Sequence, residues 1–290
     1  MRWAEHLVDA RRLWAGEAAW SGPLALIDLA RAPEPAAPLV LPPCPVIGFG
    51  DGAHPLARQL DAVVEPPVSL DRLAESILGA PRAAAVLVEL LRHTAGLEVG
   101  AALFAESLAY GLLQGSAEHG AWLARRAPGA ARPPGRLCLR READRLVIAL
   151  DRPAAGNAID RALRDALAEA FGMAALDREI AQVVLCARGR AFSLGGELAE
   201  FGTTRDPADA HAIRRRTLPA LAIARCAARL EARIGGACVG AGLEMAAFAR
   251  RCVATPASWF QLPELAMGLI PGAGGCVSLA RRIGRQRTAL

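Results

Sequence analysis

The second half of the chain alternates short apolar segments with amphipathic ones, and this alternation restricts the fold more than any other feature. LVIAL (146–150) and QVVLC (182–186) are typical of buried strands, and residues 158–171 between them have the spacing of an amphipathic helix. The same order continues with a helix predicted over 209–230, a strand over 232–239, a helix over 241–249 and a strand over 251–254. Strands that alternate with helices predict a layered α/β architecture.

Two proline-rich segments interrupt these patterns. PEPAAPLVLPPCP (33–45) and APGAARPPG (127–135) cannot form the interior of a helix or a central strand, because proline lacks the backbone N–H and fixes φ. The second segment separates two differently patterned halves. We therefore predict a boundary near 128–136, with an N-terminal domain over 1–132 and an α/β domain over 136–290.

The N-terminal half combines short strands with a longer helical region. PLALIDLA (23–30) and PVIGF (45–49) predict short buried strands within 23–49. From 69 to 126, apolar residues at helical spacing predict three helices, at about 69–80, 81–93 and 97–125, the last one broken near Gly115. GFGDG (48–52) favours a tight turn over a phosphate loop, because the third glycine of the dinucleotide pattern is missing.

Composition and charge argue against several classes of protein. No run of about 20 apolar residues could cross a bilayer, and the N-terminus lacks the regions of a signal peptide, so we expect a cytoplasmic protein that contacts no membrane. The chain has no lysine, and its 34 arginines are intermixed with 29 acids without a nucleic-acid motif, so we expect no nucleic-acid partner. The seven cysteines form no C-x-x-C pair and the five histidines no HExxH motif, which argues against a disulfide framework or a metal site.

The second half contains three separate glycine-rich turns. The first (190–198) follows a strand, the second (240–244) lies at a strand-to-helix junction, and the third comprises Pro263, Glu264 and the glycine-rich 268–275. A helix that begins at Ala241 would present unpaired N–H groups and the positive end of its dipole. A second N–H from the Gly195–Gly196 turn would complete a two-donor oxyanion hole for a carbonyl whose oxygen gains charge, such as a thioester that becomes an enolate. The alternative is that these glycines only allow tight packing.

Glu244 and Glu264 are the candidates for paired acid–base chemistry. Glu264 is the only acid in the long apolar run SWFQLPELAMGLIPG, and a buried carboxylate without a partner is costly unless it has a role or a raised pKa. Glu244 lies in the first turn of its predicted helix, where the alternative role is a charge that stabilises the helix start. Two such acids beside one water could act as general acid and base.

Together these motifs resemble the crotonase family, the enoyl-CoA hydratase/isomerase superfamily. The resemblance covers 136–290 and implies an α/β fold, a crotonase-type β-β-α spiral core, with a helix-rich N-terminal domain before it. It also implies an acyl-CoA thioester as substrate, no cofactor apart from the coenzyme A of the substrate, and a homo-oligomer, either a trimer or a hexamer. The matching stretches keep the family's order and spacing: LVIALDRPAAGNAID (146–160), VVLCARGRAFSLGGELAEF (183–201), ARIGGACVGAGLEMAAFA (232–249) and FQLPELAMGLIPGAGG (260–275).

The resemblance assigns a role to each candidate residue. The N–H groups of Gly196 and Ala241 would form the oxyanion hole, although the family usually has glycine where this chain has Ala241. Glu244 would activate a water and Glu264 would protonate the α-carbon, which amounts to syn hydration of a trans-2-enoyl-CoA in fatty acid metabolism. Glu197 would shape its turn. The residues expected to contact the substrate are Ser193, Gly195, Gly240 and Gly272.

Other functions remain open on these motifs. Double-bond isomerisation, thioester hydrolysis, decarboxylation and cofactor-free oxygenation use the same kind of oxyanion hole, and a non-catalytic subunit could bind coenzyme A with it. Trp259, Phe260 and Met267 could line the acyl pocket, with core packing as the alternative for each.

The helices predicted over 69–126 have a second possible origin. The usual family member continues beyond the motifs with a helical module that closes the acyl-CoA site, whereas this sequence ends at residue 290. AALFAESLAYGLLQGSAEHGAWLARR (101–126) resembles the last helix of that module. We hypothesise that the order is permuted, so that a helical cap precedes the core. The alternative is an unrelated N-terminal helical domain.

Overall fold

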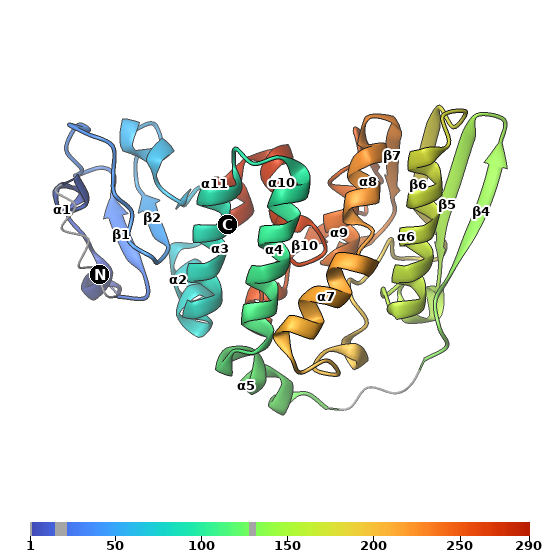
Figure 1. Ribbon diagram of the computed structural model, residues 1–290. Helices are drawn as coiled ribbons and strands as arrows, with labels where there is room; N and C mark the ends of the chain where they lie inside the picture. The colour runs from blue at the N-terminus through green and yellow to red at the C-terminus, as the bar shows by residue number, and fades with distance from the viewer. Residues whose placement is uncertain (1, 15–21, 128–131) are drawn as a thin grey trace.

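The computed structural model describes residues 2–14, 22–127 and 132–290. A small sheet lies at the N-terminal end, helices occupy the middle and a larger sheet lies at the other end (Figure 1). Part of the predicted boundary at 128–136 falls outside the described residues. Short 3-10 helices join the main elements: η1 Ala4–His6, η2 Pro55–Gln59, η3 Pro153–Ala155, η4 Leu198–Glu200, η5 Ala227–Arg229 and η6 Glu264–Met267.

The larger sheet has five strands in the order β4-β5-β6-β7-β9. Only the β4–β5 pair is antiparallel, and the other pairs are parallel. Beside it, β8 and β10 form a separate parallel pair in which Cys238 is opposite Phe260. The strands are β4 Arg136–Glu142, β5 Arg145–Asp151, β6 Gln182–Ala187, β7 Leu230–Ile234, β8 Ala237–Val239, β9 Arg251–Ala254 and β10 Trp259–Gln261.

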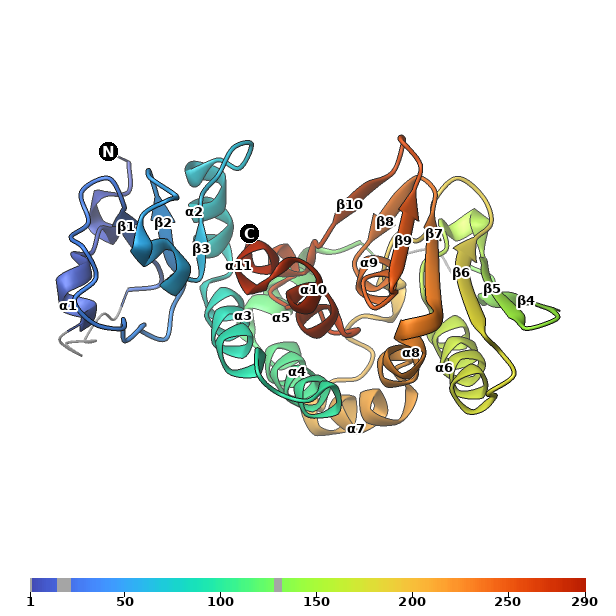
Figure 2. The ribbon, with the colours of Figure 1, turned by 90° about the horizontal axis from the view of Figure 1, so that it is seen from above.

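Helices α6 (Arg161–Leu176) and α8 (Ala220–Cys226) cover one face of the five-stranded sheet (Figure 2). Their apolar sides and the alternate residues of the strands form one hydrophobic core, in which Phe171 and Phe192 are fully buried. The alternation of strand and helix predicted from 146 to 254 is therefore confirmed, and the fold is mixed α/β.

Two predicted elements of this half are each divided in the structure. The helix predicted over 209–230 is α7 (Pro207–Thr217) followed by α8, because Leu218 precedes a proline and is extended, with ψ 130°. The strand predicted over 232–239 is β7 and β8, separated by Gly236 at φ +67°, where glycine turns the chain without strain. Helix α9 (Ala241–Ala246) is shorter than the predicted 241–249.

The N-terminal part contains a three-stranded parallel sheet in the order β1-β2-β3. The predicted strands at 23–30 and 45–49 are β1 (Ala25–Asp28) and β2 (Val46–Phe49), and the short β3 (Ala62–Val63) was not predicted. Helix α1 (Ala10–Trp14) packs against the sheet. Within the 48–52 segment, Gly48 and Phe49 belong to β2, and the chain bends directly after the strand at Gly50, with φ +98°.

The helical region has the predicted elements, including the break at Gly115. Residue bounds are α2 Leu70–Gly79, α3 Pro81–Thr94, α4 Val99–Gln114 and α5 Ala117–Arg125. Helices α10 (Gly275–Ile283) and α11 (Arg285–Ala289) at the other end of the sequence pack against α3 and α4 (Figure 2). Leucines of α3 and α4 share one hydrophobic cluster with Leu269, Ile270 and Cys276, so segments from the two halves of the chain are folded together.

Candidate active site

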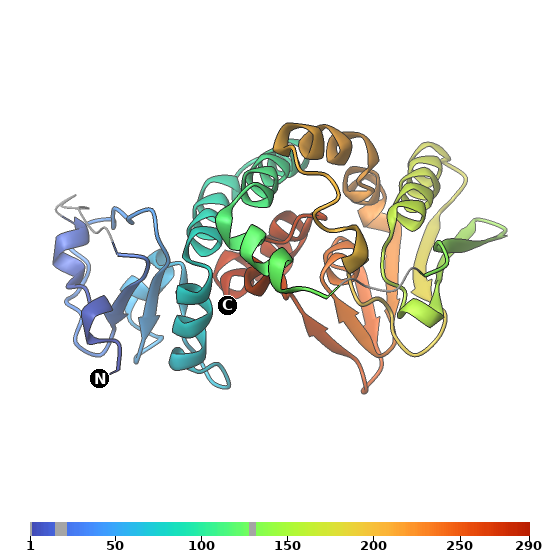
Figure 3. The ribbon, with the colours of Figure 1, turned by 90° about the horizontal axis from the view of Figure 1, so that it is seen from below.

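A cavity of about 740 Å³ lies where the two halves of the chain meet. Helices form a continuous arc from α3 and α4 through α7 and α8 to α6, above the strands (Figure 3). Seven of the eight predicted site residues line this cavity: Gly195, Gly196, Gly240, Ala241, Glu244, Glu264 and Gly272. Segments far apart in the sequence therefore meet at one site.

Ser193 is the predicted site residue that does not line the cavity. It is fully buried, and its hydroxyl donates to the Asn157 carbonyl at 2.9 Å and accepts from the Gly195 N–H at 3.2 Å. An added Cβ on Gly242 would be only 2.5 Å from the Ser193 Cβ, so this serine packs behind the turn. In this structure the hydroxyl of Ser193 is used within the protein, and its contact with substrate stays a prediction.

The three candidate wall residues are also divided by the structure. Met267 is buried and lines the cavity. Trp259 and Phe260 lie on β10, are each 49% exposed and do not line it. In this structure, Trp259 and Phe260 therefore belong neither to the pocket wall nor to the hydrophobic core.

Two backbone N–H groups in the cavity have no acceptor in the described chain. The Ile159 N–H donates to the Gly195 carbonyl and the Glu197 N–H donates to the Ile159 carbonyl, which leaves the Gly196 N–H between them unpaired. Ala241 begins α9, so its N–H has no partner within the helix. Both residues belong to the wall of the cavity.

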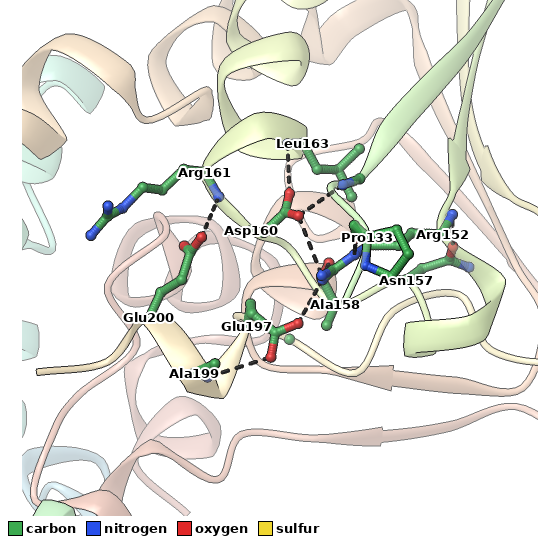
Figure 4. Close-up of polar contacts among 12 residues, drawn as sticks. Pro133, Arg152, Asn157, Ala158, Asp160, Arg161, Leu163, Glu197, Ala199 and Glu200 are labelled. Atoms are coloured by element: carbon green, nitrogen blue, oxygen red, sulfur yellow. Dashed lines mark hydrogen bonds and ion pairs between the residues drawn. The ribbon is translucent and has the colours of Figure 1, made fainter. Parts of the chain in front are cut away.

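A buried ionic network fixes the turn that carries Gly196 (Figure 4). Arg152 donates to Glu197 Oε2 at 2.7 Å and to the Ala158 carbonyl at 3.0 Å, and it lies 3.4 Å from Asp160 Oδ2. The Asn157 side chain accepts from the Arg152 N–H at 2.8 Å. Because Glu197 is held by Arg152, its carboxylate shapes the turn, as predicted from the resemblance.

Glu244 is buried and anchored by the start of α10. Its Oε2 accepts from the N–H groups of Ala273 at 2.7 Å and Gly275 at 2.8 Å. Glycine is required at 275, since an added Cβ would lie 2.6 Å from the Glu244 Cγ. Burial raises the pKa of Glu244 to about 7 and outweighs the two hydrogen bonds, which lower it.

Glu264 is the less constrained of the two acids. It lies in η6, and its Oε2 is buried without a hydrogen-bond partner in the described chain. Gly240 allows it to approach, because an added Cβ there would be 2.7 Å from Oε1. Burial, and then the charge of Glu244, raise the pKa of Glu264 to about 8.

Glu106 on α4 is a third buried carboxyl that we did not predict. It accepts from the N–H groups of Gly274 at 2.7 Å and Cys276 at 2.9 Å, so Glu106 and Glu244 interleave at the start of α10. Burial, and then the charge of Glu244, raise the pKa of Glu106. The available signal was the one used for Glu264: a lone acid in the apolar helix 99–114.

Tyr110 and Arg214 complete the helical side of the cavity, and no sequence pattern pointed to either residue. The Tyr110 ring packs against Gly272, where an added Cβ would be 2.1 Å from Cδ2. The Arg214 guanidinium lies over this ring, 4.5 Å from its centroid. These side chains bring α4 and α7 into the same site as the two predicted acids.

Residues 2–14, 22–127 and 132–290 contain no cluster of three or more metal-ligating side chains. Within the same ranges, no helix is both long and apolar enough to span a bilayer.

The family model described as enoyl-CoA hydratase/isomerase matches residues 140–289. Mevalonyl-coenzyme A hydratase from Beauveria bassiana is 33% identical over 50% of this chain and 54% of its own length. 2,3-Dehydroadipyl-CoA hydratase from Escherichia coli is 36% identical over 48% of this chain and 54% of its own.

The match thus spans about half the length of these curated relatives. Among solved structures, an enoyl-CoA hydratase from Thermoplasma volcanium matches with a TM-score of 0.46 and 30% identity, over 53% of this chain and 61% of that one.

Proposed function

Because the chain belongs to the enoyl-CoA hydratase/isomerase family, we propose that its cavity binds an acyl-CoA thioester and hydrates the double bond of a trans-2-enoyl-CoA. One observation carries this proposal: the free N–H groups of Gly196 and Ala241 line the same cavity as the carboxyls of Glu244 and Glu264. Two fixed donors suit the thioester oxygen, and two acids suit the carbons beside it.

The donors would stabilise the enolate that forms when water adds to the β-carbon. The negative charge then moves to the thioester oxygen, and backbone donors in a site shielded from water stabilise it without reorganisation. Removing one such donor typically costs about 3–4 kcal/mol of transition-state stabilisation. The buried Arg152 network supports this role, since it holds the Gly196 turn rigid.

The environments of the two acids support different roles. A base that takes a proton from water must be ionised, and an acid that protonates the α-carbon must hold a proton. The pKa of Glu244 is raised to about 7 and that of Glu264 to about 8, so Glu244 ionises first. Glu244 would therefore activate the water, and Glu264 would deliver the proton to the α-carbon.

We further propose that residues 70–125 serve as the helical cap of this site. Tyr110 and Gln114 of α4 line the cavity. In α5, His119 Nδ1 lies 2.9 Å from the carbonyl oxygen of Met267, at the end of η6, which also carries Glu264. These contacts support the permuted order, since helices that precede the core in sequence close its cavity.

The test is hydration of crotonyl-CoA, followed by the loss of enoyl-thioester absorbance. Glu244→Gln and Glu264→Gln should each lower kcat by about 100-fold or more. Glu200→Gln is the matched control, because Glu200 also lines the cavity but accepts a hydrogen bond from the Arg161 N–H. Loss in only one of the two variants would instead support isomerisation. Binding of coenzyme A without turnover of any thioester would support a non-catalytic subunit.

A further inference from the structure

Arg214 is a cation in the cavity wall whose hydrogen-bond partners are all neutral. Its Nε and one Nη donate to the hydroxyl and carbonyl of Ser107, at 3.3 and 3.0 Å, and its other Nη donates to Gln114. The guanidinium also covers the Tyr110 ring. Three of its five N–H groups are thus used, and one on each terminal nitrogen has no acceptor in the described chain.

No carboxylate of residues 2–14, 22–127 or 132–290 lies within 4.0 Å of the Arg214 side-chain nitrogens. Arg92 pairs with Asp61, and Arg152 pairs with Asp160 and Glu197. Arg229 has no carboxylate partner either, but it donates to the backbone carbonyls of Ala174, Asp177 and Ile180. A partly desolvated cation without a counter-charge is costly. Arg214 differs from Arg229 because it lines the cavity with two free N–H groups, which points to a negative group that comes from outside the chain.

Glu106 does not serve as that counter-charge. It interacts with Arg214 only over a longer distance, and both of its oxygens already accept backbone N–H groups at the start of α10. Burial raises the pKa of Glu106, which favours its neutral form near neutral pH. The positive charge of Arg214 therefore remains uncompensated on the side that faces the cavity.

The position of Arg214 indicates which part of a thioester it would meet. Arg214 lies over the Tyr110 ring, and that ring packs on Gly272 in the wall of the cavity that Glu244 and Glu264 also line. The guanidinium thus belongs to the part of the wall that α4 and α7 form, in the same cavity as the two acids. Arg161, which also lines the cavity, is exposed to solvent instead.

On the basis of the proposed function, we infer that Arg214 binds a carboxylate at the far end of the acyl chain. The preferred substrate is then the mono-CoA thioester of an unsaturated dicarboxylic acid. The two free N–H groups match the two oxygens of a carboxylate, which a guanidinium binds in bidentate geometry. Gln114 and Ser107 hold the guanidinium in place before the substrate arrives, so less side-chain entropy is lost on binding.

The experiment compares trans-2-hexenoyl-CoA with the same thioester carrying a carboxylate in place of its terminal methyl group. The wild-type protein should have a higher kcat/KM for the carboxylate substrate by roughly 10-fold or more. Arg214→Gln should lower the ratio of the two kcat/KM values by roughly 10- to 100-fold. Arg164→Gln is the matched control, because Arg164 also lines the cavity but pairs with Asp165, and it should leave the ratio unchanged.

Two results would overturn the inference. One is a wild-type protein that prefers the neutral substrate, and the other is an Arg214→Gln protein that loses activity equally on both, as expected if Arg214 binds a phosphate of coenzyme A. Arg214→Lys is the second variant in case Arg214→Gln fails to fold. It keeps the positive charge without the bidentate guanidinium, so it should retain part of the preference for the carboxylate substrate.

Failure of the proposed function would be recognised separately, by absence of turnover with either thioester. The affinities of the two saturated thioesters, measured by calorimetry, would then test whether Arg214 binds the terminal carboxylate. Tighter binding of the carboxylate form supports the inference, and equal binding overturns it.

Discussion

Replacement of Glu106 by alanine tests whether the N-terminal helices stabilise the start of α10. Glu106 accepts from two buried N–H groups, at 2.7 and 2.9 Å, and each would lose its only acceptor. An unsatisfied buried donor costs about 1–3 kcal/mol, so two donors cost about 2–6 kcal/mol. Relief from burying the carboxyl offsets part of this, and we expect a loss of about 3 kcal/mol in the free energy of unfolding.

Thermal unfolding measures this loss directly. For a chain of this size, 1 kcal/mol corresponds to a shift in Tm of about 2–4 °C, so Glu106→Ala should lower Tm by roughly 6–12 °C. Glu118→Ala is the matched control. Glu118 also accepts from two N–H groups, those of Arg82 at 2.9 Å and Ala83 at 3.1 Å, but these contacts are near solvent. This control should cost about 1 kcal/mol, as for an exposed helix cap.

Equal shifts in the two alanine variants would refute the argument, because burial of the acceptor would then have no effect. Glu106→Gln keeps the size of the side chain but only one of its two acceptors. Its amide oxygen can accept from one of the two N–H groups, whereas its amide nitrogen only donates and faces the other. We therefore expect a loss of stability between that of the wild-type protein and that of Glu106→Ala.

Three further predictions concern the cavity. The pKa values of Glu244 and Glu264 are raised from 4.5 to about 7 and about 8, so above pH 4.5 the folded state binds more protons than the unfolded state. The free energy of unfolding should therefore fall as the pH rises from 5 to 8. The double Gln variant should flatten the plot of Tm against pH, and an unchanged slope would contradict these shifts. Gly240→Ala should lower kcat/KM for crotonyl-CoA by roughly 100-fold, because it places a Cβ against Glu264 at a residue with φ +47°. Gly172→Ala, in an open part of α6, is the control and should leave activity unchanged, and equal activities of the two variants would refute the role of Gly240. Arg152→Met should lower kcat more than it raises KM, since it releases the Gly196 turn, and a rise in KM alone would contradict that role.

The sequence was sufficient where the relevant information is local. Strand and helix periods fixed the order of elements from 146 to 254, and glycine and proline marked most of the turns. The lone acid in an apolar run identified Glu264 as unusual, and the structure leaves its Oε2 unpaired. Patterns of this kind work because side-chain period and backbone freedom act within a few residues.

The sequence was insufficient where a residue acts through a distant partner. Ser193 looks like a site residue from its neighbours, yet its hydroxyl is used by Asn157 and Gly195 inside the protein. Glu106 contacts Cys276, 170 positions away, and no local period encodes that contact.

The chain by itself thus determined its family, its element types and most of the residues around the cavity, because these depend on short segments. Tertiary structure alone decided that α4 and α7 close the site, that a third carboxyl shares the start of α10, and that Arg214 faces the cavity without an acid beside it. Those facts depend on which surfaces pack together, and packing is a property of the folded chain as a whole.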